Sequence, residues 1–148
     1  MASARDVALF FACKADDEAG DSITNLKIQK LLYYAQGAHL AIHGEPLFEE
    51  PIEAWTHGPV VPDVYDELKS LGSKSIQVDG MCDAFNRLNE QEQSVVNEVY
   101  DVYGQYSAWK LRDMTHQEPP WVDTENGKAI GLDSLKQFFS TLVTQDGA

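Results

Sequence analysis

Basic side chains and cysteines are both scarce in this chain of 148 residues. Lysine and arginine number 11 against 24 aspartates and glutamates, which gives a net charge of −13. A surface this acidic repels a phosphate backbone, so we expect no direct nucleic-acid partner. The cysteines, Cys13 and Cys82, form no C-x-x-C pair, and we interpret them as reduced structural thiols in a reducing cytoplasm.

Long hydrophobic runs are absent too. The longest unbroken one, Val7 to Cys13, has seven residues, whereas a bilayer span needs ~20. The first residues lack a basic stretch followed by an apolar one, so no export signal is indicated. We therefore expect a cytoplasmic protein without membrane contact. Its length is that of a single domain, over residues 1–148, which folds without a disulfide, a metal or another cofactor.

Familiar catalytic motifs are missing. The sequence contains no G-x-S-x-G, no glycine-rich phosphate loop and no cysteine with a plausible neighbouring base, so nucleophilic and phosphoryl chemistry have no assembled residues. His39 and His43 are four residues apart on an expected helix, a spacing that lets both reach one metal ion. The H-E-x-x-H motif, however, needs a carboxylate where Leu40 stands. We interpret the pair as ordinary helix residues.

Two further histidines, His57 and His116, each lie in an irregular segment near a tryptophan. There an imidazole can serve the loop backbone as donor and acceptor at once. Alternatively, the two histidines with Glu118 form the centre of a small metal-dependent hydrolase. The sequence favours the structural role and leaves the catalytic one open.

Apolar periodicity and helix-breaking residues divide the chain into helical segments. Capping residues precede several of them, and glycines follow them. The sequence predicts a mainly α fold, a compact single-domain bundle of five to six helices. The expected helices cover residues 3–13, 24–44, 62–71, 89–104, 107–114 and 132–143.

The middle of the chain has a different pattern. Residues 52–55 alternate in polarity like a short strand, and the glycine and prolines of residues 58–62 exclude a regular helix directly after it. Ile76 and Val78 also alternate with polar residues, so they can supply the second strand of a short two-stranded β element. Residues 115–121 have no periodicity and are expected to form a loop.

The acids are unevenly distributed. Residues 31–68 contain no lysine or arginine but seven acids, a pattern that fits either a solvated acidic face or a surface that guides a basic protein partner. The same span offers Trp55, Val60, Val61 and Tyr65, which are either interface anchors or core. The acids are Glu45, Glu49, Glu50, Glu53, Asp63, Asp66 and Glu67.

Three motifs follow one another in the chain: LKIQKLLYYAQG at 26–37, IEAWTHGPVVPDVY at 52–65 and LRDMTHQEPPW at 111–121. Their order resembles the SocA-like antitoxin family, the Panacea domain, whose members include phage-associated GepA-like proteins. The resemblance extends over about residues 24–139. Met114 and the second proline, Pro119, are conservative departures from the family's third motif.

The resemblance implies an antitoxin, often carried on mobile elements such as prophages. It would neutralise the toxin encoded beside it by direct binding, without catalysis of its own. The family is paired with toxins of unrelated kinds, so the toxin's activity stays open. One member acts as an adaptor that delivers its toxin to an AAA+ protease, which is the alternative role.

Carried over residue by residue, the resemblance divides the motif positions into two sets. The expected structural positions are Lys30, Tyr34 and Thr115. The expected partner-binding positions, with Val60 added from the anchor set above, are Trp55, His57, Gly58, Pro59, Val60, Tyr65, His116 and Trp121.

These positions suggest how the segments pack. We expect the helix at 24–44, the Gly-Pro segment and the Thr-His segment to converge. Lys30 is the only base between Lys27 and Lys69, so we expect it to be the counter-ion of a nearby acid at this junction.

Overall fold

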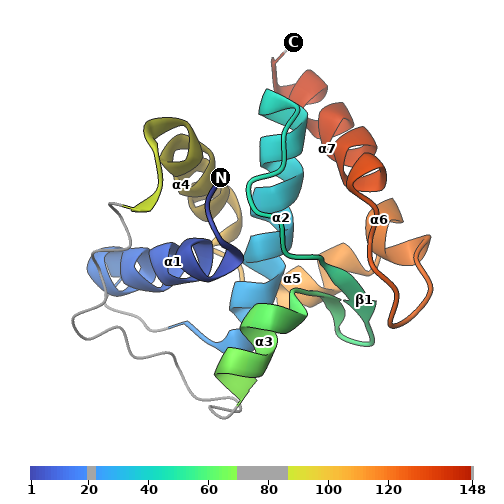
Figure 1. The fold of residues 1–148 in the computed structure, drawn as a ribbon, viewed down its shortest axis with the longest axis horizontal. Helices are drawn as coiled ribbons and strands as arrows, with labels where there is room; N and C mark the ends of the chain where they lie inside the picture. Colours follow the sequence, from blue (N-terminus) through green and yellow to red (C-terminus); the bar gives the residue numbers. More distant parts are fainter. Residues whose placement is uncertain (20–22, 70–86, 148) are drawn as a thin grey trace.

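The structure is a computed structural model that describes residues 1–19, 23–69 and 87–147. These residues form seven helices and one two-stranded antiparallel sheet (Figure 1). The predicted mainly α fold with a short β element is confirmed. In chain order the elements are α1 (Ala4–Ala19), α2 (Asn25–His43), β1 (Glu53–Trp55), β2 (Gly58–Val60), α3 (Pro62–Leu68), α4 (Glu90–Tyr103), α5 (Ala108–Thr115), α6 (Pro119–Val122) and α7 (Leu132–Gly147).

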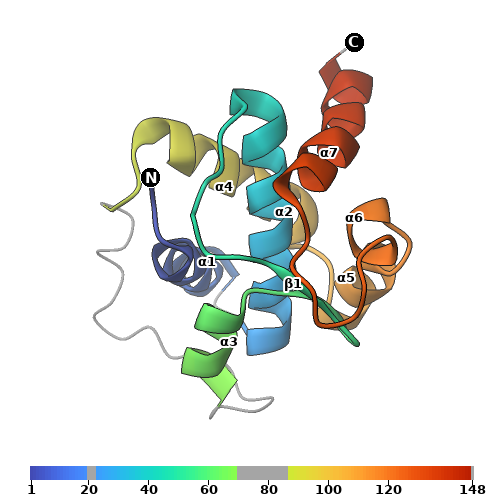
Figure 2. The same cartoon turned by 45° about the vertical axis from the view of Figure 1, so that its right-hand side comes forward.

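Helix α2 is the centre of the molecule. Figures 1 and 2 show it running through the middle, with α1 and α4 on one side and α7 on the other. Most residues of α2 are buried, and they lie on every face of the helix. They include polar residues such as Gln29, Lys30 and Gln36. A helix buried all round must have neighbours on every face, and α2 contacts α1, α3, α4, α5, α7 and β2.

The helix ends follow local signals that the sequence shows. The Thr24 side chain caps the start of α2, and Gly44 ends it in the left-handed conformation at φ 74°. Asn89 and Glu92 form the reciprocal capping box of α4. The expected boundaries of these two helices are confirmed because the capping interactions are satisfied within a few residues of sequence.

The β element differs from the expectation. The strand at residues 53–55 pairs with residues 58–60 across the turn Thr56-His57, with Ala54 opposite Pro59. A proline is tolerated there because that pair lies between the hydrogen-bonded pairs of the ladder, so the missing N–H is not needed. Ile76 and Val78, the expected partner strand, lie outside the described residues.

The segment between α5 and α7 also differs. We expected a loop over residues 115–121, but Pro119–Val122 forms the single helical turn α6. Proline suits the first turn of a helix because the N–H that it lacks would have no partner there. So short a turn has no apolar periodicity that would reveal it in the sequence.

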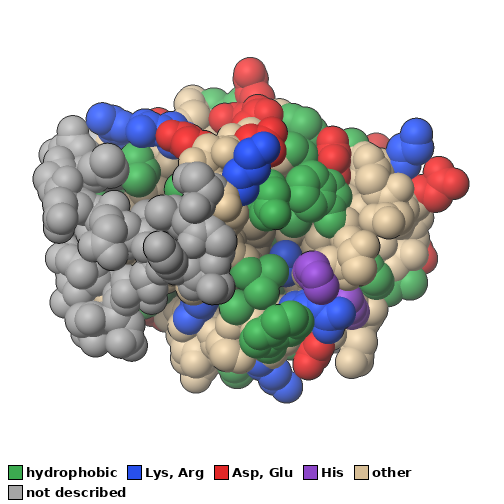
Figure 3. Space-filling view, turned by 90° about the horizontal axis from the view of Figure 1, so that it is seen from below, with side chains coloured by type: hydrophobic (Ala, Val, Ile, Leu, Met, Phe, Trp, Pro, Cys, Tyr) green, Lys and Arg blue, Asp and Glu red, His purple; other side chains and the backbone are tan. Residues whose placement is uncertain are grey.

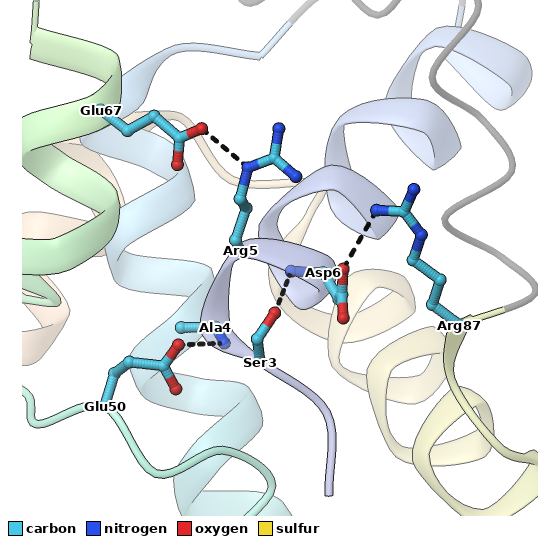
Figure 4. A network of polar contacts seen from close by, with 7 residues as sticks. All are labelled: Ser3, Ala4, Arg5, Asp6, Glu50, Glu67 and Arg87. Carbon is cyan, nitrogen blue, oxygen red and sulfur yellow. Dashed lines mark hydrogen bonds and ion pairs between the residues drawn. The ribbon is translucent and has the colours of Figure 1, made fainter.

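The start of α1 is fixed by side chains from several parts of the chain (Figure 4). The Ser3 hydroxyl accepts a hydrogen bond from the Asp6 N–H at 3.0 Å. The Asp6 carboxylate pairs with Arg87, which precedes α4, at 3.3 Å. The expected cap at Ser3 is therefore present.

Two acids of the acidic span also serve this helix start. Glu50 accepts a hydrogen bond from the Ala4 N–H at 3.1 Å, and Glu67 of α3 pairs with Arg5 at 2.7 Å (Figure 4). Part of the negative charge that the sequence concentrates in residues 31–68 is thus directed at α1.

Over the described residues, no helix has the length and apolar character to cross a bilayer.

We predict that Gly37→Ala destabilises the protein. Gly37 of α2 lies directly against the Phe139 ring of α7, and a methyl group at this position would overlap that ring. The overlap outweighs the gain in helix propensity, so the free energy of unfolding should fall by about 2–3 kcal/mol. Urea unfolding measures it.

A double-mutant cycle provides the control for this prediction. Phe139→Leu removes the ring that the new methyl group would strike, so Gly37→Ala should cost less in that background than in the wild type. Equal costs in the two backgrounds would show that the ring contact is not the cause.

Candidate functional site

The three sequence motifs meet at the first half of α2. The side chain of Lys30 is fully buried, and its Nζ donates a hydrogen bond to the Pro59 carbonyl at 3.0 Å. Gly58 has a positive φ of 109°, and a Cβ there would lie 2.9 Å from both Lys30 Cε and Thr115 Oγ1. Only glycine permits this approach. The expected convergence of the three segments is confirmed, and we call this contact the junction.

Lys30 has no acidic partner, contrary to the expectation. Among residues 1–19, 23–69 and 87–147, no carboxylate lies within ion-pair distance of its Nζ. Burial, followed by the positive charge of Arg112, lowers the pKa of Lys30 to about 7. The interior accommodates this ammonium by a hydrogen bond to a backbone carbonyl and by easy loss of its proton.

Glu118 ties the third motif to the same helix. The hydroxyls of Tyr33 and Tyr34 donate to its two carboxylate oxygens at 2.9 and 3.0 Å. Burial raises the pKa of Glu118 to about 7, although both hydrogen bonds favour its charged form. Burial and the nearby carboxylate raise the pKa of both tyrosines. Tyr34 also stacks on Tyr103 of α4, with ring centres 3.9 Å apart.

His116 and Trp121 pack against the other side of the hairpin that β1 and β2 form (residues 53–60). Their rings stack with centres 4.1 Å apart, and the Trp121 Nε1 donates to the Trp55 carbonyl at 2.8 Å. Burial, then the charges of Arg112 and Lys30, lowers the pKa of His116. Its buried Nε2 has no hydrogen-bond partner among the described residues. Both side chains lie in packed positions that fix the hairpin on the domain.

An open pocket of about 770 Å³ lies beside the junction, between the start of α2, the hairpin, α3 and the loop before α7. Trp55 and Tyr65 form its aromatic wall, with ring centres 4.9 Å apart and an interplanar angle of 69°. The Trp55 Nε1 is satisfied by Glu53 at 2.9 Å. Figure 3 views the molecule from below, where hydrophobic and histidine side chains lie beside Lys or Arg and Asp or Glu side chains.

A second aromatic group adjoins the pocket. His57 lines the pocket and accepts a hydrogen bond at Nδ1 from Arg112 Nε at 3.3 Å. The Arg112 guanidinium also lies 5.3 Å from the centre of the Trp109 ring, a cation–π distance. The Trp109 side chain is 59% exposed. A large aromatic residue therefore contacts Arg112 while most of its surface faces solvent.

Sequence reasoning did not single out Trp109 or Arg112 as site residues. The available signal was the position of Arg112 inside the third motif, four residues before His116. Trp109 carried no such signal because an aromatic residue on a short helix usually packs inward.

Of the remaining positions that we predicted to contact a partner or to act as anchors, some are buried and others are exposed. His57 is exposed and Trp55 and Tyr65 are partly exposed, whereas Val61 is fully buried and belongs to the core. Three of the positions expected to contact a partner are buried, and Val60 alone of these lines the pocket. These three are Gly58, Pro59 and Val60.

Of the histidine pair on α2, His39 is engaged in other contacts. The Nδ1 of His39 lies 2.6 Å from the Glu45 carbonyl, and its Nε2 faces Gln91 at 3.4 Å. Within the described part of the chain, no group of three or more His, Cys, Asp or Glu side chains could hold a metal ion. The hydrolase alternative for His57 and His116 therefore finds no metal centre there.

The fold and site define a small, mainly helical domain with a pocket and a fixed aromatic surface. Comparison with known proteins specifies it further: the model of the family "Antitoxin SocA-like, Panacea domain" matches residues 28–122. Antitoxin SocA of Caulobacter vibrioides is 48% identical over 120 residues, which cover 74% of this chain and 64% of that relative. The chain belongs to the SocA-like antitoxin family.

Two further facts qualify the comparison. The chain spans less than two thirds of the length of the curated relative that it matches. No solved structure matches the chain. Membership in an antitoxin family suggests a role without catalysis.

We predict that Glu118→Gln changes how stability depends on pH. In the folded protein the Glu118 pKa is about 7, against 4.5 ordinarily, so between these values the folded state binds a proton that the unfolded state has lost. Wild-type stability therefore falls as pH rises through this window. The variant has no such group, so its stability does not fall in this way. Its free energy of unfolding relative to that of the wild type should therefore rise by up to about 3 kcal/mol from pH 4.5 to 8. Chemical denaturation across that range measures it.

The matched control is Glu125→Gln, which neutralises an exposed loop carboxylate. Its stability should follow the wild-type curve across the same range. If the Glu118→Gln and wild-type curves run parallel, burial does not affect Glu118 as described.

Proposed function

We propose that this protein is an antitoxin that neutralises the product of the neighbouring toxin gene by binding it directly in the cytoplasm. The toxin would bind the pocket and its Trp109 rim, which we call the aromatic face: Trp55, His57, Tyr65, Trp109 and Arg112. The observation that carries the proposal is the exposed Trp109 ring held by Arg112 beside an open pocket. Family membership supports it.

The composition of the aromatic face suits protein binding. Tryptophan, tyrosine and arginine are the residues that most often dominate the binding energy of protein interfaces. Covering Trp109 would remove on the order of 100 Å² of apolar surface from water, worth about 2–3 kcal/mol. The ring is already fixed by its neighbours, so little conformational entropy is lost on binding.

Within this proposal the predicted residues have two roles. Trp55, His57 and Tyr65 contact the toxin. The buried or packed positions hold the hairpin and α5 in place and act only through them; these are Lys30, Tyr34, Gly58, Pro59, Val60, Thr115, His116 and Trp121.

Co-expression with the neighbouring gene tests the proposal. That gene alone should arrest growth, and its co-expression with this protein should restore growth and yield a complex that co-purifies. A neighbour that is harmless by itself would contradict the proposal. Rescue accompanied by disappearance of the toxin, dependent on an AAA+ protease, would favour the adaptor role instead of neutralisation by a stable complex.

We predict that Trp109→Ala weakens toxin binding without weakening the fold. The exposed ring contributes little to the core, so the free energy of unfolding should change by less than about 0.5 kcal/mol. The Kd should rise by at least about tenfold because an interface anchor is lost. Calorimetric titration and urea unfolding measure the two quantities.

Leu132→Ala serves as the control for this substitution. Leu132 is another exposed hydrophobic residue, 47% exposed at the start of α7 and outside the aromatic face. Its truncation should leave the Kd within about twofold of the wild-type value. Similar losses of affinity for both variants would argue against the aromatic face as the binding surface.

A further inference from the structure

The charge on the described lining of the pocket is opposite in sign to the net charge of the chain. Acids exceed bases by 13 in the sequence, yet among the described residues that line the pocket Lys69 is charged and none is an aspartate or glutamate. The described part of the pocket lining in this acidic protein thus carries a positive charge.

Other cations lie close to this corner. Arg112 reaches the ring of His57 on the pocket wall, and Lys30 lies buried beneath Gly58.

Three carboxylates lie next to these groups but are not among the described residues that line the pocket. Asp66 lies 3.7 Å from Lys69, with both side chains more than 60% exposed. Asp113 lies 3.2 Å from Arg112. Exposed ion pairs of this kind contribute little stabilising free energy, so the cation can readily pair with another carboxylate instead. The third, Glu53, accepts the Trp55 Nε1–H.

Two other acids of the span serve other surfaces. Glu67 binds Arg5 and borders a small hollow against α1, and Glu50 lies beside the N-terminal residues (Figure 4). The carboxylates of Glu50 and Glu67 are therefore directed at α1 and do not line the pocket.

The pocket has the size and wall chemistry for a short peptide segment. Its volume of about 770 Å³ is in the range of sites that hold a ligand of several side chains. Leu26, Trp55 and Tyr65 supply apolar wall, while Thr56 and Asn126 offer polar groups to a peptide backbone.

We propose that the pocket binds an acidic linear segment of the toxin, with an apolar side chain against Trp55 and Tyr65 and a carboxylate that pairs with Lys69. This inference rests on the proposed function and specifies the chemistry of its partner. It differs from the basic partner that the acidic span of the sequence suggests.

Thr56 permits a test in which only the sign of a charge differs. Thr56 is exposed on the hairpin turn and lines the pocket, so Thr56→Glu and Thr56→Lys add similar bulk at one place. Against the purified product of the neighbouring gene, Thr56→Glu should raise the Kd by about tenfold or more, and Thr56→Lys should leave it unchanged or lower it. The reverse order, or equal effects, would overturn the inference.

A second pair of variants separates local contact from general attraction. Lys69→Glu should raise the Kd by about tenfold, whereas Lys136→Glu, the same change on exposed α7, should stay within about twofold. Equal effects would overturn the inference. If the wild-type protein binds the toxin and all variants bind equally, only the inference fails. If the wild-type protein does not bind it, the proposed function fails as well.

Discussion

The contact between the Lys30 ammonium and the Pro59 carbonyl is the constraint on which the rest of the site depends. A buried cation without a carboxylate is costly, and here it is stabilised by one backbone group and a low pKa. That bond fixes β2 on α2, requires glycine at position 58 and leaves Thr115 packed below. With the hairpin fixed on this side and Trp121 bonded to its other strand, the turn between the strands has a defined place at the surface.

The junction and the aromatic face have different structural roles. Residues of the junction are buried, and their hydrogen bonds are internal, as for Glu118 with Tyr33 and Tyr34. The aromatic face lies directly outside, where Trp109 and Arg112 contact His57 of the hairpin turn. Motif positions therefore mostly build the support for the surface that we propose as the toxin-binding site.

The sequence predicted what local interactions determine. Caps such as Thr24 and the Asn89–Glu92 box show where helices begin because their hydrogen bonds join residues three apart. The pairing of residues 53–55 with residues 58–60 was not predicted, since proline and glycine in residues 58–60 are typical of irregular loops and their pairing depends on the turn. The ion pair expected for Lys30 was wrong because a backbone carbonyl, which sequence patterns do not mark, takes that place. The exposure of Trp109 depends on where α5 packs, so the sequence did not reveal it.

The central claim is that a partner covers the surface above the junction. Hydrogen–deuterium exchange of the whole chain, alone and with the purified product of the neighbouring gene, tests it most directly. Slower exchange should appear at residues 55–58 and 108–112 when the partner is added. Protection confined to the groove between α4 and α7, where Ile42 and Val102 are exposed, or no protection at all, would contradict the claim.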